Sequence, residues 1–163
     1  MDSALPETSP TYLQLLERIL SLKPAELGLA PSDAAPQVWG VVVELGYHVG
    51  SATLVALADG TTSLHYSTGG GMLGRPDYAP IAQASRALVI EAQKFLALTE
   101  PSLDFSLPTP GQVRFFLLAY SGVYTTSAPE KSLATGKHPL ALLFKRVQEI
   151  LDQLRQLAVK KRK

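Results

Sequence analysis

The amino-acid sequence predicts an α+β domain in which helices pack on an antiparallel sheet of about five strands. Residues 38–45 form a β-branched, apolar run that is typical of a strand. Two short turn signals, Asp59-Gly60 and Ser121-Gly122, each lie between strand-like segments, and turns this short join antiparallel strands. Apolar residues repeat with helical spacing over residues 77–98 and 139–159. The expected order of elements is therefore α-βββ-α-ββ-α.

The composition divides the chain into three parts. Its 163 residues are enough for one domain with a core of its own. We expect an N-terminal helix and an Ala/Pro-rich linker over residues 1–36, a single α+β domain over residues 37–159, and a basic tail over residues 160–163. Ser9 and Pro10 are residue types that begin a helix. The apolar face expected for this helix contains Tyr12, Leu15, Leu16, Ile19 and Leu20.

The first sheet segment starts with residues 38–45, which are nearly all apolar and therefore predict a central strand covered on both faces. Residues 52–58 form the next strand, and Asp59-Gly60 predicts a two-residue hairpin turn after it. This turn would pair Val55 with Leu64. The residues that this register places on one core face are Val55, Leu57, Leu64 and Tyr66.

Two long helices and a second hairpin complete the domain. Asp77 is the expected N-cap of a helix that ends near Leu98. Its buried stripe is expected to contain Ile81, Ala84, Leu88, Ala92 and Phe95. Residues 112–120 and 123–127 form the second hairpin, whose first strand has apolar residues on both faces. The last helix, expected over residues 139–159, has an apolar arc wide enough to pack on a sheet.

Composition and charge exclude several classes of function. The chain has no cysteine, which suits a reducing compartment, and no apolar stretch long enough to span a bilayer, so we expect a cytoplasmic protein that binds no membrane. The start of the chain lacks the pattern of a signal peptide. The net charge is +1, and four of the 15 basic residues are the last four of the chain. The remaining sequence is acidic, so we expect no nucleic-acid partner.

Two glycine-containing segments are the candidate ligand sites. Gly69, Gly70, Gly71 and Arg75 lie between a strand and the helix that begins near Asp77. Lys137 and His138 precede the last helix. Because N–H groups at the start of a helix bind anions, both segments are compatible with a small-anion or nucleotide site. The glycine spacing matches neither a P-loop nor a dinucleotide fingerprint, and simple connections between elements are the alternative.

No pattern of catalytic residues is present. The three histidines, His48, His65 and His138, lack the spacing of metal ligands, so we expect no metal and no cofactor. Glu44 and His65 fall in neighbouring expected strands, where surface positions are the simpler interpretation. No nucleophile lies in the sequence context that activates it, which disfavours an enzyme and leaves no catalytic residue to name.

Four stretches resemble a group of small bacterial proteins with no assigned activity. They are VWGVVVELGY, ATLVALADGTTSLHYSTGGG, GQVRFFLLAYSGVYT and TGKHPLALLF. The resemblance covers the chain from Gln37 to Leu157 and implies no catalytic residue. The helix and strand content is also similar to that of Roadblock- and profilin-like interaction domains. In those domains two strands precede the helix and three follow it, whereas here three precede and two follow.

The leading functional hypothesis is a non-enzymatic protein-interaction module that forms a homodimer or binds another protein. It rests on a sheet with apolar residues on both faces and few helices to cover them. The residues expected at the interface are Phe116, Leu118, Leu143, Ile150 and Leu157. The competing interpretation is that the N-terminal helix covers the second sheet face within one chain. The alternative function is small-anion or nucleotide binding by Gly69–Gly71 and the Lys137-His138 loop.

Overall fold

The computed structural model describes residues 10–74, 78–102, 104 and 106–162, and it confirms an α+β fold built on one antiparallel sheet. The strands are β1 (Val38–Tyr47), β2 (Gly50–Leu57), β3 (Thr62–Tyr66), β4 (Gly71–Leu73), β5 (Glu100–Pro101), β6 (Gln112–Ala119) and β7 (Gly122–Pro129). Their order across the sheet is β4-β3-β2-β1-β6-β7-β5. The α-helices are α1 (Pro10–Leu20), α2 (Ala79–Ala92), α3 (Glu130–Ala134) and α4 (Ala141–Arg162). Two 3-10 helices, η1 (Pro24–Leu27) and η2 (Gln93–Leu98), complete the described elements.

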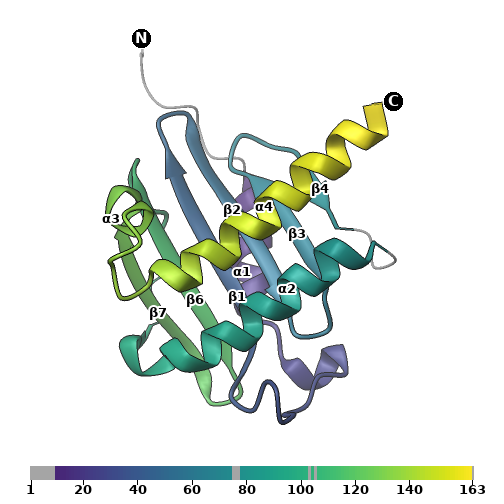
Figure 1. The fold of residues 1–163 in the computed structure, drawn as a ribbon, viewed down its shortest axis with the longest axis vertical. Helices are drawn as coiled ribbons and strands as arrows, with labels where there is room; N and C mark the ends of the chain where they lie inside the picture. Colours follow the sequence, from purple (N-terminus) through teal and green to yellow (C-terminus); the bar gives the residue numbers. More distant parts are fainter. Residues whose placement is uncertain (1–9, 75–77, 103, 105, 163) are drawn as a thin grey trace.

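β1 is the centre of the sheet, as its apolar run predicts. It pairs antiparallel with β2 on one side and with β6 on the other. Alternate side chains of a strand point to opposite faces, so Val41 and Val43 enter one core while Val42 enters the other. All three are fully buried. The sheet is therefore covered on both faces (Figure 1).

The larger core lies between the sheet and the helices α2 and α4, which cross the same face side by side (Figure 1). Phe115 and Leu117 of β6 enter this core, as their alternation predicts, and both have no exposed surface. The most deeply buried line of α4 contains Leu143, Val147, Ile150 and Leu154. The half-buried Arg146 of α4 bridges to the buried Glu91 of α2 at 3.2 Å and joins the two helices.

The second face is covered by α1, so the interpretation in which the N-terminal helix folds back within the chain fits the structure (Figure 1). Leu16, Ile19 and Leu20 of α1 are buried. The sheet residues in the same cluster are Trp39, Val42, Val55, Leu57, Phe116 and Leu118. A linker with η1 near its start leads from α1 around the edge of the molecule to β1.

The described residues form seven strands, whereas about five were expected. The additional β4 arises because residues 67–70 turn the chain back beside β3, whereas a direct connection to the following helix was expected. β5 is a two-residue pairing with β7. A short helix, α3, forms between the second hairpin and the last helix, where no helix was expected. The helix expected to reach Leu98 ends as α-helix at Ala92 and continues as the 3-10 helix η2. Asp77, the expected N-cap, lies outside the described residues.

The register expected for the first hairpin is wrong by one residue. Val55 pairs with Ser63, and Leu64 pairs with Leu54. Gly60 has a φ of 94° and its N–H donates to the carbonyl of Leu57, so the loop has three residues instead of two. A shift of one residue reverses the faces of a strand. Leu64 consequently enters the α2/α4 core, apart from Val55 and Leu57, and Tyr66 is 40% exposed.

The second hairpin turns one residue earlier than expected. Ala119 pairs with Gly122, so Tyr120 and Ser121 form the turn. α4 begins at Ala141 and continues to Arg162, beyond the helix expected over residues 139–159. Three of the four residues assigned to the basic tail therefore continue the helix. No helix among the described residues is long and apolar enough to cross a membrane.

Candidate functional site

The glycine segment proposed as a ligand site serves as the turn of the β3–β4 hairpin. Gly69 and Gly70 have φ values of 110° and 81°, which L side chains rarely adopt. Gly71 begins β4 and pairs with His65. A Cβ at Gly71 would lie 2.2 Å from the carbonyl oxygen of Leu64. These glycines are therefore explained by strand pairing, and Arg75 lies outside the described residues.

Lys137 and His138 lie at the opposite side of the sheet. They follow α3, next to β7, whereas the Gly69–Gly71 turn lies at the β4 edge (Figure 1). The Nδ1 atom of His138 accepts a hydrogen bond from the N–H of Leu140 at 3.0 Å, close to the start of α4. The two segments do not converge, so one anion site formed by both is inconsistent with the structure.

Substitutions of the glycines separate a structural role from ligand binding. Gly71→Ala is expected to destabilise the protein by about 1–3 kcal/mol, because its methyl group would overlap a strand carbonyl. Gly69→Ala meets open space and is expected to cost about 1 kcal/mol through its backbone conformation alone. Urea unfolding of both variants measures the difference. Equal losses would contradict the close packing at Gly71.

The five residues expected at an interface are all buried within the single chain. Phe116 and Leu118 lie beneath α1, and Leu143, Ile150 and Leu157 lie between α4 and the sheet. Their exposed fractions are 6% or less. The folded chain does not present them to a partner, because α1 covers the face that was expected to be open. Their burial therefore gives no support to a dimer formed through them.

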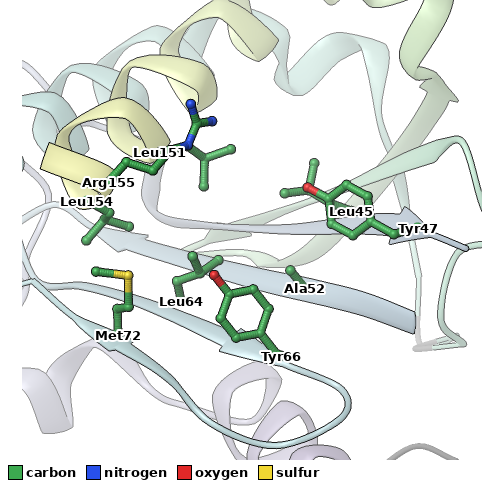
Figure 2. A pocket seen from close by; sticks show the side chains of 9 residues that line it. All are labelled: Leu45, Tyr47, Ala52, Leu64, Tyr66, Met72, Leu151, Leu154 and Arg155. Carbon is green, nitrogen blue, oxygen red and sulfur yellow. The ribbon is translucent and has the colours of Figure 1, made fainter. Parts of the chain in front are cut away.

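An apolar pocket lies between the C-terminal half of α4 and the strands β1 to β4 (Figure 2). Leu45, Ala52 and Leu64 form its floor, and α4 contributes Leu151 and Leu154. Tyr47, Tyr66, Met72 and Arg155 complete the lining. Its volume is about 120 Å³. Drug-sized ligands and nucleotides occupy pockets of roughly 300–1,000 Å³, whereas a dry cavity of roughly 150 Å³ holds benzene. This pocket therefore suits one aliphatic or aromatic side chain.

The polar groups of the pocket lie at its rim. Burial is the main cause that raises the pKa of Tyr47, with Glu130 and Tyr66 adding to it and Arg155 opposing it. Tyr47 therefore keeps its proton at neutral pH and offers a hydroxyl donor. Figure 2 shows the guanidinium of Arg155 beside Leu151. This guanidinium pairs with Asp152 at 3.0 Å. An apolar centre with neutral and cationic donors at its rim suits binding more than catalysis.

The outer edge of β4 borders this pocket, and no strand of the described residues pairs with it. Tyr66 donates to the carbonyl of Gly70, and Gly74 donates to that of Thr62. Along an antiparallel pair of strands, residues that hydrogen-bond to the neighbouring strand alternate with residues that do not. The main-chain N–H and C=O groups of Met72 therefore point toward β3, and those of Gly71 and Leu73 point away from it. The Leu73 side chain is 69% exposed. β4 thus presents outward main-chain donors and acceptors beside an apolar pocket.

Glu44 is a second unusual feature, on the opposite face of the sheet. It is the central acidic residue of β1, paired with Thr53 of β2 and Arg114 of β6, and it has no exposed surface. Neither carboxyl oxygen has a hydrogen-bond partner. Burial raises the pKa of Glu44 to about 8, against the opposing charge of Arg114. The side chain is therefore neutral at pH 7, in contrast to the surface position expected for it.

The polar side chains around Glu44 form hydrogen bonds with groups other than its carboxyl. The hydroxyl of Tyr12 hydrogen-bonds to those of Thr53 and Ser51. Arg114 donates to the carbonyl of Ser106 at 2.8 Å and to the hydroxyl of Thr125 at 3.3 Å. His65 lies beyond Thr53 in the register, so it does not adjoin Glu44 directly. Within the described part of the chain, no cluster of His, Asp and Glu side chains is arranged to hold a metal ion.

Sequence reasoning missed both features for identifiable reasons. The pocket is lined by residues of the strands β1 to β4 and of α4, which lie far apart in the sequence. Leu64 lies in its floor because of the observed hairpin register, which differs by one residue from the register that was expected. Glu44 did carry a signal, because a carboxylate inside the run VVVEL must lie on one of two covered faces.

Comparisons with protein-family models, with curated proteins and with solved structures find no match to this chain. The resemblance to small bacterial proteins therefore stays a hypothesis. The fold and the geometry of the two sites carry the functional argument.

Proposed function

We propose that this protein is a non-enzymatic interaction module that binds an extended segment of a partner protein along β4. The segment pairs with the outward main-chain groups of Gly71 and Leu73 and places one apolar side chain in the pocket beside Met72. The observation that carries the proposal is the adjacency of an unpaired strand edge and a pocket of single-side-chain size.

The pairing geometry supports an extended partner. A strand added beside β4 would hydrogen-bond at Gly71 and Leu73, since their polar groups face outward. Its residue opposite Met72 would have its side chain on the same face as Met72, toward α4. Main-chain pairing would then provide affinity, and the pocket would select an apolar side chain.

Charge favours an acidic partner over a second copy of this chain. The last turns of α4 lie on the β3–β4 side of the sheet, and the chain ends in Lys160, Lys161, Arg162 and Lys163 (Figure 1). Pairing of two β4 edges about a two-fold axis would bring toward each other the two copies of Arg155, the basic residue that lines the pocket. Like charges in close approach oppose association, whereas carboxylates beside the anchor residue would favour it. The absence of cysteine supports a cytoplasmic setting for this interaction.

A peptide titration tests the proposal directly. The chain has two methionines, Met1 and Met72, so the ¹³C-labelled methyl group of Met72 reports on the pocket. The probe is the acetylated and amidated peptide Asp-Glu-Leu-Glu-Asp, and the control peptide has serine in place of leucine. We expect the Met72 signal to shift with the leucine peptide alone, because the pocket requires an apolar group.

Two variants locate the binding. Leu73→Pro removes an outward N–H from the strand edge and is expected to abolish the shift. Leu142→Ala changes a 52% exposed side chain on another part of α4 and is expected to preserve it. Equal shifts with both peptides, or full binding by Leu73→Pro, would overturn the proposal. A Met72 signal that depends on protein concentration without peptide would show that a second copy is the partner instead.

A further inference from the structure

The core beneath α1 differs from the core beneath α2 and α4 in the hydrogen bonding of its buried polar side chains. Among the described residues, the buried side-chain atoms without a hydrogen-bond partner are Nε1 of Trp39 and both carboxyl oxygens of Glu44. All three atoms belong to the face that α1 covers. A buried polar group without a hydrogen-bond partner loses its contacts with water and gains nothing in return, so covering this face carries a free-energy penalty that the described part of the α2/α4 face lacks.

The second buried carboxyl provides an internal comparison. Glu91, in the α2/α4 layer, is 6% exposed and bridges to Lys94 at 3.1 Å and to Arg146 at 3.2 Å. These hydrogen bonds and charges outweigh burial and lower the pKa of Glu91. Glu44 receives no such bonds, because the guanidinium of Arg114 is directed to Ser106, Thr125 and Asp104. An ionised Glu44 therefore has no donor within the closed structure.

Hydration of an ionised Glu44 requires one of its neighbours to move. Thr53 and Arg114 are held on either side by the main-chain ladder of the sheet. Tyr12 approaches from α1, which precedes a linker of residues 21–37 and has no strand pairing to restrain it. The movement that admits water at least cost is therefore the separation of α1 from the sheet.

We infer that α1 is a releasable cover of the second sheet face, and that ionisation of Glu44 beneath it drives the release. The closed state contains a neutral carboxyl, and the open state contains a hydrated carboxylate. Opening exposes an apolar surface formed by Trp39, Val42, Val55, Leu57, Phe116 and Leu118. This surface is separate from the β4 edge, so the inference does not depend on the proposed function.

The other titratable groups near this face lie outside the pH range of the transition. Burial is the main cause that raises the pKa of Tyr12 above its usual value of 10.0, with Glu44 adding to it. Burial lowers the pKa of His65 below 6.5, and hydrogen bonds from Ser106 are the main cause that lowers the pKa of Asp104. Burial also raises the pKa of Tyr120, which packs against this face. Among these described groups, Glu44 is the one whose charge changes between those limits.

Trp39 reports on α1 without added probes. It is the one tryptophan in the sequence, and its side chain is 3% exposed beneath α1. Acrylamide quenching of its fluorescence is measured from about pH 6 to about pH 9.5, below the usual range of tyrosine ionisation. We expect the quenching constant to rise several-fold as pH increases. Glu44→Gln, which cannot ionise, is expected to keep the low value at every pH.

Matched variants distinguish release from other causes. Glu91→Gln removes the other buried carboxyl and is expected to preserve the transition. Leu16→Ala weakens α1 docking and is expected to move the transition to lower pH. The α-amino group also titrates near pH 8, but Glu44→Gln retains it and therefore controls for it. A transition that survives in Glu44→Gln, or ionisation of Glu44 seen by ¹³C NMR without any change in quenching, would overturn the inference.

Discussion

Phe115→Ala is expected to lower the free energy of unfolding by about 3–5 kcal/mol, the largest stability loss we predict for a single side chain. Phe115 has no exposed surface and lies on β6, next to the central strand, in the core beneath α2 and α4. Its removal leaves a cavity that the paired strands on both sides cannot close. Urea unfolding followed by circular dichroism measures the loss.

Leu142→Ala is the matched control for this substitution. Leu142 is 52% exposed on α4, so its truncation is expected to change stability by no more than about 0.5 kcal/mol. A similarly small effect for Phe115→Ala would show that the α2/α4 core is not packed as described. Phe116→Ala extends the comparison, since Phe116 is equally buried but lies beneath α1. If α1 is released at high pH, the loss of stability caused by Phe116→Ala is expected to be smaller there.

Glu44→Gln is expected to remove a strong pH dependence of stability. The pKa of Glu44 is raised from 4.5 to about 8 in the folded protein, so the folded state holds a proton that the unfolded state releases. The resulting stability is fully present below about pH 4.5 and declines as the pH rises to about 8, by about 1.4 kcal/mol per pH unit. The wild-type protein should therefore lose about 3 kcal/mol between pH 6 and 9 through this group.

Urea unfolding at pH 6 and pH 9 compares the two proteins. The wild type is expected to be markedly less stable at pH 9, and Glu44→Gln is expected to differ little between the two conditions. If α1 leaves the sheet before the rest of the protein unfolds, the loss of stability at high pH cannot exceed the free energy with which α1 docks on the sheet. The size of the loss then measures that docking free energy. Equal pH dependence in the two proteins would contradict a neutral, buried Glu44.

Local pattern determined the class of fold and most of its elements. From Val38 to Leu45 polar residues do not alternate with apolar ones, as they would in a strand with one face in water, and this strand is central in the sheet. The alternation in β6 sends Phe115 and Phe116 to opposite cores, as predicted. The amphipathic faces of α1 and α4 likewise select the sides that become buried. Periodicity is a property of neighbouring residues and needs no knowledge of distant ones.

Register and the short strands depended on geometry that local pattern does not specify. Gly60 adopts a positive φ and adds one residue to the first loop, which moves Leu64 to the face opposite Val55. The glycines at 69 and 70 turn the chain back along β3, so β4 forms where a connection was expected. In both places glycine permits several conformations, and packing against the sheet selects one of them.

The properties of Glu44 show most clearly what the tertiary structure decided. Its carboxyl is neutral because it is buried, with Tyr12 of α1 nearby, and because Arg114 bonds to the loop at Ser106, and none of these contacts is local in sequence. The pocket at β4 likewise combines residues from β1 to β4 with residues of α4. The sequence by itself determined which segments are helices or strands and which sides of them are apolar. The tertiary structure decided which of those sides meet, because burial, pKa and cavity shape depend on atoms brought together from distant parts of the chain.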